Sequence, residues 1–327
     1  MKKCLITLLI ICGLSGLKAS SWQSSDEPNI IVVVLDGIRW QDVFSHPKQS
    51  TRLPKLFKRY GKRAVTKGNL FKKQPFETAA VPKSLPVYQT LFSGKIPYCW
   101  HNYCGRIKKP TFAQRLLRDP KFKRKDVAII ASWDHLRYAA QNEAGSLLVN
   151  AGLSTFRLPD RTNPGWLKAL NRMQRKYRPG WRSARYDAYS IKFSLRYIER
   201  YRPRFMFVAL NDADEWAHDN SYWGYYHSLK LYDQYLQSLF EKLDDMGRYG
   251  RRTNVIITSD HGRGKGKRWT SHGKHVPSSK YTWFVAVGPD IERNRKAIYK
   301  NMNSMVDMQT LIESIFYSVE ESKWAAR

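Results

Sequence analysis

The sequence predicts an α/β protein with a doubly wound, mostly parallel central sheet flanked by helices. Two observations lead to this fold class. Apolar, β-branched runs of strand length recur along the chain, and amphipathic segments with helical spacing lie between them. Continuous apolar runs suit strands that are buried on both faces, as in parallel sheets. No linker rich in Pro, Gly or Ser divides the chain, so we expect residues 20–327 to form one domain.

Five runs are expected to form strands, and they span residues 30–35, 127–131, 205–210, 254–258 and 283–287. The clearest amphipathic patterns predict helices over residues 188–201, 222–246 and 308–319. The least regular part of the sequence is residues 141–185, which we interpret as a candidate cap for the functional face.

The first twenty residues have the pattern of a secretory signal peptide. Lys2 and Lys3 precede an apolar run over residues 5–14, and small residues follow up to Ala19. Because this run is short for a membrane span, we predict a signal peptide over residues 1–19, with an uncleaved anchor as the alternative. No later segment is apolar enough for a membrane helix, so the mature chain is expected to be soluble and exported, either periplasmic or secreted.

Two cysteines, Cys99 and Cys104, remain once Cys4 and Cys12 are removed with the leader. In an oxidising compartment, thiols this close in sequence favour a short-loop disulfide. A metal-binding pair is the alternative, but no second Cys or His pair lies nearby in the sequence to complete a closed site.

The chain is strongly basic, with 57 Lys and Arg against 27 Asp and Glu, a net charge of +30. The leader carries three lysines and no acid, so +27 remains after its removal. Such a charge concentrates anionic substrates near the protein. The basic residues are spread over residues 55–73, 118–125, 172–185 and 265–274, and we identify no nucleic-acid-binding module. We therefore expect a generally basic surface.

Carboxylates follow three of the predicted strands. Asp36 comes directly after the first run, Asp260 follows the fourth run after Ser259, and Asp214 lies shortly after the third. The carboxyl ends of parallel strands meet at one edge of a sheet, where ligands bind in this fold class. His218 lies four residues after Asp214, on the same face of a helical turn, and His261 follows Asp260. Mixed carboxylate and imidazole ligands favour Zn²⁺, with Mn²⁺ as the alternative.

Ser84 is the candidate nucleophile. The apolar spacing after Pro86 predicts a helix that Gly94 can end, which places Ser84 at or just before the helix N-terminus. Backbone N–H groups and the helix dipole favour an alkoxide and a bound phosphoryl group there. A simple N-cap is the alternative interpretation of this serine. The predicted metal ligands elsewhere in the chain favour the nucleophile.

Taken in order, these elements resemble the alkaline phosphatase superfamily, especially its nucleotide pyrophosphatase/phosphodiesterase-like and related phosphatase branches. The resemblance covers residues 29–289 and rests on an ordered set of motifs, namely strand-Asp36-Gly37, Ser84 before its helix, Asp214-x-x-x-His218, Asp260-His261-Gly262 and His272-Gly273. It implies two divalent metal ions. Asp36, Asp260 and His261 would bind one ion, with Ser84 bridging to it, and Asp214, His218 and His272 would bind the other.

His275 is the alternative to His272 as the last ligand. Four further histidines match no ligand position of the family, namely His46, His101, His135 and His227. The resemblance implies hydrolysis of phosphate monoesters or diesters through a seryl-phosphate intermediate on Ser84, with the metal ions assisting both apical oxygens.

Two positions depart from the patterns of the family. Val87 follows Ser84-Leu85-Pro86, so the Asn that holds the phosphoryl oxygens in the phosphodiesterase branch is missing. Candidates to replace it are Lys83, Asn102 and the basic loop 263–268 with Lys265, a loop that we expect to be solvated and to border the site. Tyr88 occupies the position of the Arg that formylglycine sulfatases require, so a sulfatase ranks below a phosphatase. A lipid-head-group phosphotransferase and a non-catalytic polyanion-binding protein are further alternatives.

Overall fold

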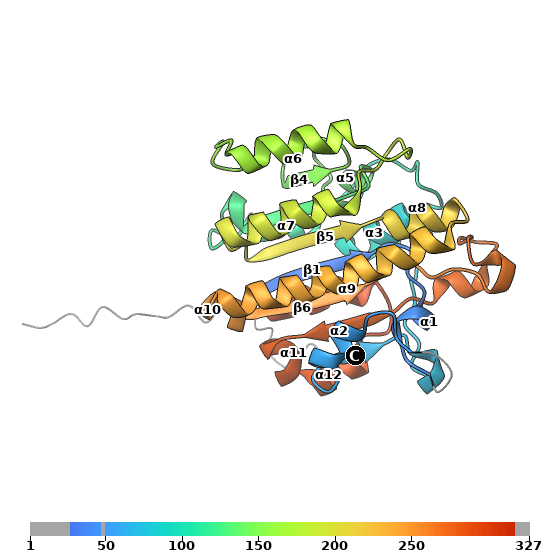
Figure 1. The fold of residues 1–327 in the computed structure, drawn as a ribbon. Helices are drawn as coiled ribbons and strands as arrows, with labels where there is room; N and C mark the ends of the chain where they lie inside the picture. Colours follow the sequence, from blue (N-terminus) through green and yellow to red (C-terminus); the bar gives the residue numbers. More distant parts are fainter. Residues whose placement is uncertain (1–26, 47–49, 318–327) are drawn as a thin grey trace, which may run out of the picture.

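The computed structural model describes residues 27–46 and 50–317, and a seven-stranded sheet runs through it with the strand order β2-β7-β6-β1-β5-β3-β4 (Figure 1). The strands are β1 (Asn29–Leu35), β2 (Val65–Lys67), β3 (Val127–Ala131), β4 (Leu148–Ala151), β5 (Phe205–Leu210), β6 (Thr253–Thr258) and β7 (Phe284–Val287). Strand β7 is antiparallel to both of its neighbours, β2 and β6. All other neighbouring pairs are parallel, which confirms the predicted mostly parallel sheet.

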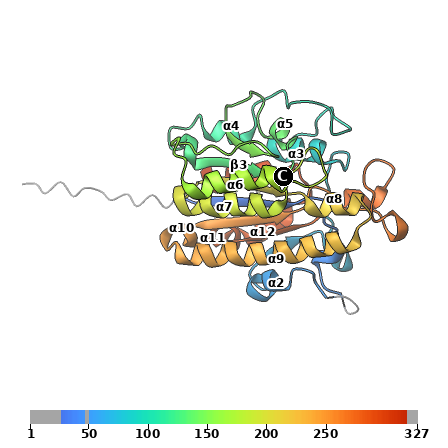
Figure 2. The ribbon, with the colours of Figure 1, turned by 45° about the horizontal axis from the view of Figure 1, so that its top comes forward.

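Helices cover both faces of this sheet (Figure 2). The α-helices are α1 (Trp40–Val43), α2 (Pro54–Tyr60), α3 (Ser84–Ser93), α4 (Phe112–Leu116), α5 (Leu136–Ala140), α6 (Gly165–Lys176), α7 (Asp187–Tyr201), α8 (Asp212–His218), α9 (Tyr222–Asp245), α10 (Arg248–Arg251), α11 (Pro289–Arg293), α12 (Arg295–Asn301) and α13 (Asp307–Tyr317). Short 3₁₀ helices are η1 (Leu70–Lys72), η2 (Arg124–Asp126), η3 (Gly266–Arg268) and η4 (Pro277–Lys280).

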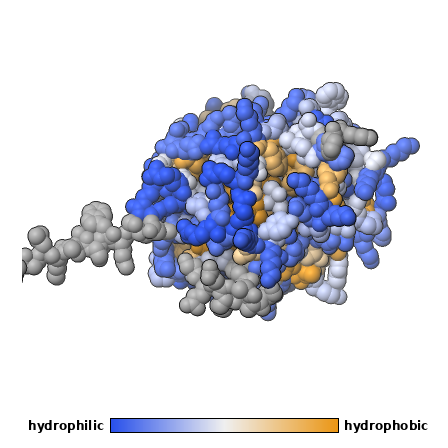
Figure 3. Space-filling view, turned by 90° about the horizontal axis from the view of Figure 1, so that it is seen from below, coloured by the Kyte–Doolittle hydropathy of each residue, from blue (hydrophilic) through white to orange (hydrophobic). Residues whose placement is uncertain are grey.

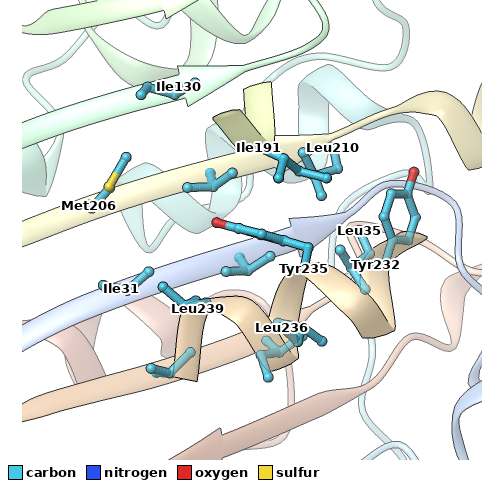
Figure 4. Close-up of a cluster of buried hydrophobic side chains, with 14 of the residues drawn as sticks. Ile31, Leu35, Ile130, Ile191, Met206, Leu210, Tyr232, Tyr235, Leu236 and Leu239 are labelled. Carbon is cyan, nitrogen blue, oxygen red and sulfur yellow. The ribbon is translucent and has the colours of Figure 1, made fainter. Parts of the chain in front are cut away.

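Alternate residues of the central strand β1 enter two different cores. Ile31 and Leu35 belong to the core beneath α7 and α9, where Tyr235 and Leu236 face the strands (Figure 4). Val32 and its even-numbered neighbours belong to the opposite core, against α3, α4 and α13. Burial of each aliphatic side chain contributes about 1.5–3 kcal/mol to stability. An uninterrupted apolar sequence is therefore required in β1, because both of its faces are covered.

The five predicted strands and three predicted helices are all present, and within the described residues their bounds differ from the prediction by at most one residue. Helix α13 ends at Tyr317, and the last two residues predicted for it lie outside the described residues, as does the predicted signal peptide. Residues 141–185, interpreted as the least regular part of the sequence and as a candidate cap for the functional face, are only partly irregular, and their role as a cap stays a prediction. They contain β4 and α6, and α6 packs against α7 beside the edge of the sheet (Figure 1).

The surface is largely hydrophilic where it can be seen in space-filling view, with apolar atoms exposed in patches between charged side chains (Figure 3). Among residues 27–46 and 50–317, no helix combines the length and the apolar composition that a membrane crossing requires.

Candidate active site

Three adjacent strands bring the acidic residues to one edge of the sheet. Strands β6, β1 and β5 are neighbours, and their arrowheads point the same way, toward α8 (Figure 1). Gly37 adopts a positive φ of 66°, and a Cβ atom there would lie 2.3 Å from Asp214 Oδ1. The Gly37 N–H donates to Asp260 Oδ1 at 3.0 Å. A glycine after Asp36 is therefore needed for the three strand ends to meet.

The first cluster consists of Asp36, Asp260 and His261, whose candidate ligand atoms all lie within 4.8 Å of one another. His261 Nε2 lies 3.6 Å from Asp36 Oδ1 and 3.3 Å from Asp260 Oδ2. All three side chains are buried. Asp36 Oδ1 and Asp260 Oδ2 are buried without a hydrogen-bond partner, a situation that costs about 1–3 kcal/mol per group when nothing compensates for it. The two oxygens without a hydrogen-bond partner, Asp36 Oδ1 and Asp260 Oδ2, thus belong to the same compact cluster.

The second cluster is formed by Asp214, His218 and His272, and it adjoins the first through His261. His218 Nε2 lies 3.2 Å from Asp214 Oδ2 and 3.0 Å from His272 Nε2. Asp214, His261 and His272 also present candidate ligand atoms within 4.8 Å of one another. The six ligands that the resemblance implies therefore come together, and His272 does so rather than the exposed His275.

Hydrogen bonds fix the tautomers of two of the histidines. His261 Nδ1 lies 3.0 Å from the Gly262 carbonyl, and His272 Nδ1 lies 2.8 Å from the Pro82 carbonyl. A carbonyl only accepts, so each Nδ1 must carry the proton and each Nε2 keeps a lone pair that faces the clusters. Second partners of this kind orient metal-binding histidines in proteins.

The electrostatics of the site are dominated by burial. Burial and the nearby charges of Asp260 and Asp214 raise the pKa of Asp36 well above its usual range. Burial and the charge of Asp214 raise the pKa of Asp260 to about 7. Burial lowers the pKa of His261 well below its usual range and lowers the pKa of His272 to about 3. His261 and His272 are therefore neutral at pH 7, while the Asp36 and Asp260 carboxylates disfavour each other's ionisation.

Arg263 is a member of the site that sequence reasoning missed. It was expected on a solvated basic loop, but its side chain is buried. Its guanidinium forms an ion pair with Asp214 Oδ1, and its Nε donates to the Gly37 carbonyl at 3.0 Å. Burial raises the pKa of Asp214, but the charges of Arg263 and His218 outweigh burial and hold that pKa well below its usual range. Asp214 Oδ2 remains on the side of His218. The position of Arg263 directly after Asp260-His261-Gly262 was the available signal.

Ser84 is the first residue of α3, as predicted, and Gly94 ends this helix in the left-handed conformation. The Ser84 hydroxyl is buried and lies 3.5 Å from His261 Nε2, at the edge of the first cluster. Asn102 Oδ1 accepts a hydrogen bond from the Leu85 N–H at 3.0 Å, so this amide lies beside the nucleophile candidate. Two of the three candidate substrate-binding residues, Asn102 and Lys83, thus neighbour Ser84.

Lys83 extends over Gly273, where an added Cβ atom would lie 2.8 Å from Lys83 Cε. A cavity of about 250 Å³ adjoins this point, between residues 77–82 and 273–280. The third candidate, Lys265, is exposed and lines a different hollow together with Arg39, Arg52 and Tyr222. That hollow includes none of the predicted ligands.

Tyr88, at the position where formylglycine sulfatases have an Arg, forms a hydrogen bond to Asp36 through its neutral hydroxyl. Its hydroxyl donates to Asp36 Oδ2 at 3.0 Å, and the ring is buried against Phe207. Burial and the charge of Asp36 raise the pKa of Tyr88 well above its usual range, so the hydroxyl remains a donor. Tyr88 therefore orients one oxygen of Asp36 and leaves Oδ1 toward the cluster. The sequence motif drew attention to Tyr88 but did not indicate that Asp36 is its hydrogen-bond partner.

A buried carboxylate outside the predicted set holds the loop that carries Asp214. Asp187 accepts hydrogen bonds from the N–H groups of Asn211 and Asp212, both at 2.8 Å, and from the Tyr232 hydroxyl at 2.6 Å. The Asp187 N–H in turn donates to the Asp212 carboxylate at 3.1 Å. This network fixes the turn from β5 into α8.

The remaining predictions concern residues away from the clusters. Cys99 and Cys104 form a disulfide, as expected. Three of the histidines without a predicted role, His101, His135 and His227, have local partners. Histidine 46 also lies outside both clusters.

The donor set fits divalent metal ions. It combines ionisable carboxylates, neutral imidazoles with oriented lone pairs and buried oxygens that lack partners, the features of zinc-type sites. If Asp36, Asp214 and Asp260 are all ionised, three buried negative charges face the one positive charge of Arg263, which leaves an excess of negative charge. A cation between these groups would relieve that repulsion.

The fold and the family match place the chain in the alkaline phosphatase superfamily. The family described as "Type I phosphodiesterase / nucleotide pyrophosphatase" matches residues 30–312. The chain belongs to this family. A search of curated protein sequences finds no significant match.

Solved structures share the fold at low sequence identity. A putative sulfatase from Bacteroides thetaiotaomicron is 13% identical with a TM-score of 0.62, over 88% of this chain and 70% of that one. The C-terminal periplasmic domain of EcEptC from Escherichia coli, in complex with Zn, is 12% identical with a TM-score of 0.53, over 90% and 84%. The lipoteichoic acid synthase LtaP from Listeria monocytogenes is 10% identical with a TM-score of 0.55, over 88% and 72%. At these identities the likeness supports the fold alone.

Proposed function

We propose that this protein is an exported, metal-dependent phosphoric ester hydrolase in which Ser84 is the nucleophile. The observation that carries the proposal is the pair of buried clusters next to Ser84, in which carboxylate oxygens without partners face oriented imidazole lone pairs. Family membership supports the reaction class. Export rests on the signal-like leader and is supported by the similarity to a periplasmic domain.

Two divalent ions, with Zn²⁺ favoured and Mn²⁺ as the alternative, would be held by Asp36, Asp260, His261 and Ser84 on one side and by Asp214, His218 and His272 on the other. When bound, such ions supply the positive charge that activates a hydroxyl and stabilises a leaving oxygen. Our assignment of ligands to the two ions follows the clusters, with His261 between them.

The chain itself provides the nucleophile, Ser84, and the backbone groups that position the phosphoryl group. Ser84 Oγ attacks phosphorus, a seryl-phosphate forms as the ester oxygen leaves, and water then hydrolyses it. The N-terminal backbone of α3 favours the phosphoryl group at this position. No separate general base would be required if bound divalent ions activate the Ser84 hydroxyl.

Asn102 and Lys83 are the candidates to bind phosphoryl oxygens. Asn102 Oδ1 is engaged by the Leu85 N–H, which leaves its amide N–H₂ group near the helix N-terminus as a donor. Lys83 directly precedes Ser84 and extends toward His272. We assign Lys265 a weaker role, since it lines a separate hollow. An anionic phosphate ester is the expected substrate, and the strongly basic chain would attract it.

The test is steady-state hydrolysis of p-nitrophenyl phosphate, bis-p-nitrophenyl phosphate and p-nitrophenyl sulfate by metal-loaded protein, with and without EDTA. We expect EDTA-sensitive turnover of one of the phosphate esters and much slower turnover of the sulfate. Faster turnover of the sulfate would favour the sulfatase alternative. Transfer of phosphate to an added alcohol in place of water would favour the phosphotransferase. No metal-dependent turnover by folded, metal-loaded protein would contradict the proposal.

A further inference from the structure

A short loop beside Ser84 carries an unusual concentration of exposed apolar side chains. Tyr98 is 90% exposed, Tyr103 83%, Ile96 61% and Trp100 51%. These four are among the eleven large hydrophobic residues that are exposed in residues 27–46 and 50–317, and they fall within eight consecutive positions. Exposed apolar groups gathered in this way mark interaction surfaces in soluble proteins. We call residues 95–104 the aromatic loop.

The backbone of the aromatic loop is held in place while these side chains point outward. The Cys99–Cys104 disulfide closes it, and Cys99 is buried. Asn102 ties it to α3, and Gln89 Nε2 of α3 donates to the Gly105 carbonyl at 2.9 Å. The rings of Tyr98 and Trp100 contact each other edge-on, with centroids 4.1 Å apart. The loop thus presents a braced aromatic surface that the core does not use.

The charged residues next to the loop in the sequence are all basic. Lys95, Lys108 and Lys109 are exposed, and Arg106 lies between them in sequence. Residues 78–118 contain no Asp or Glu. A stretch of this length without an acid is notable even in a chain with a net charge of +30, since that chain still contains 27 acidic residues. A partner with apolar groups and a net negative charge would complement this part of the surface.

We propose that the aromatic loop docks the protein on an anionic phospholipid surface. Trp and Tyr side chains partition to the boundary between head groups and acyl chains, because their rings are apolar and their N–H or O–H groups stay hydrated. Each Lys or Arg close to an anionic bilayer strengthens binding by about fivefold. Long Lys side chains also place their stems along apolar surface while the ammonium group remains in water. The loop has both components side by side.

Docking through this loop would bring Ser84 near the lipid surface, because Asn102 connects the loop to the start of α3. The inference concerns binding alone, and it does not rest on the proposed hydrolysis. A protein that bound vesicles without turnover would fail only the proposed function, and one that hydrolysed soluble esters without binding vesicles would fail only this inference.

The experiment is co-sedimentation of the folded protein with vesicles of phosphatidylcholine alone and of phosphatidylcholine with phosphatidylglycerol in equal parts. The test variant is Tyr98→Ser/Trp100→Ser, which leaves every charge in place. The matched control is Tyr222→Ser/Trp223→Ser, which removes an exposed Tyr and Trp, 48% and 71% exposed, from the start of α9. Tyr103→Ser is a second loop variant, for use if the double variant does not fold.

We expect the wild type and the α9 control to bind the anionic vesicles within about twofold of each other, and the loop variant to bind at least about tenfold more weakly. Binding to phosphatidylcholine alone should be weaker for all of them. Equal binding of the loop variant and the wild type would show that diffuse charge alone is responsible and would overturn the proposal. Wild-type protein that remains in the supernatant would also overturn it and would favour a protein partner for the loop.

Discussion

At the scale of single residues, the site brings together buried carboxylates that repel one another when they are ionised, and a cation between them would relieve this repulsion. Asp36 and Asp260 are buried side by side, and each has an oxygen without a hydrogen-bond partner. Burial and neighbouring charge raise both pKa values, that of Asp260 to about 7. His261 and His272 have lowered pKa values and need release no proton before they bind a metal. Metal binding should therefore be linked to ionisation of the carboxylates.

The first prediction concerns pH. Below their raised pKa values Asp260 and Asp36 carry protons that must leave on metal binding, so affinity should rise as pH increases through about pH 7. The expected slope below that point is about tenfold per pH unit for each proton released. Zn²⁺ titration calorimetry in two buffers of different ionisation enthalpy measures the proton count. Asp260→Asn should bind more weakly and lose part of the dependence, and an affinity unchanged between about pH 5.5 and 7.5 would contradict this linkage.

The second prediction concerns Tyr88. Tyr88→Phe removes the hydrogen bond to Asp36 Oδ2 but keeps the buried ring, so the carboxylate loses its orientation. Loss of such an outer partner lowers metal affinity or activity about 10–100-fold. Tyr235→Phe is the matched control, since it removes a buried hydroxyl that contacts Ser194 in the opposite core. If both variants retain full metal affinity and turnover, Tyr88 is only a packing residue.

At the scale of elements, the turn from β5 into α8 determines where Asp214 and His218 lie. Asp187, at the start of α7, accepts the hydrogen bonds of the N–H groups of Asn211 and Asp212. Helix α8 has only seven residues, and a helix this short depends on tertiary contacts to form. Asp187 is thus a positioning residue for one side of the predicted metal centre.

The third prediction follows from this arrangement. Asp187→Asn replaces one acceptor oxygen by an N–H₂ group facing a backbone N–H, which should lower the free energy of unfolding by about 1–3 kcal/mol. It should also weaken metal binding by Asp214 and His218. Asp233→Asn provides the control, because Asp233 accepts from the N–H groups of Lys55 and Leu56 at the start of α2, away from the clusters.

Chemical denaturation should show both variants destabilised, while metal analysis after dialysis should show a loss only in Asp187→Asn. Equal metal content in the two variants would mean that Asp187 contributes to stability alone.

The elements that could be predicted are those whose sequence pattern has one physical cause. Strands β1, β5 and β6 are continuous apolar runs, and the acids that follow them must meet at one edge of a parallel sheet. Strands β2 and β4 have three and four residues, too few for a pattern. The direction of β7 depends on its pairing partner, which the run itself does not encode.

Among the site residues, too, those with a local sequence signal could be predicted and those without one could not. Ligands at strand ends and the serine at a helix start have local signals, whereas Arg263, Tyr88 and Asp187 act through contacts across the fold. Arginine is mostly found on surfaces, so only its place directly after Asp260-His261-Gly262 set Arg263 apart from its exposed neighbours, and its contact with Asp214 is visible only in the fold.

At the scale of the whole molecule, the net charge of +30 is the dominant property, and it is spread along the chain. The fourth prediction is that kcat/KM for an anionic phosphate ester falls about tenfold between low ionic strength and about 0.5 M NaCl, because salt screens the field that concentrates the substrate. A zwitterionic ester such as p-nitrophenyl phosphorylcholine serves as the control and should respond less. Equal salt responses for the two substrates would argue against attraction by the whole molecule.

The central claim is that Ser84 is the nucleophile of a metal-dependent phosphoester hydrolysis. The most direct measurement is acid quench of the metal-loaded protein during turnover of its best phosphate ester, followed by mass spectrometry of the peptide that contains Ser84. We expect phosphorylation at Ser84, none after EDTA treatment, and a Ser84→Ala variant that retains its fold but loses turnover by at least about 10³-fold. A Ser84→Ala variant with its metal content and activity intact would contradict the account.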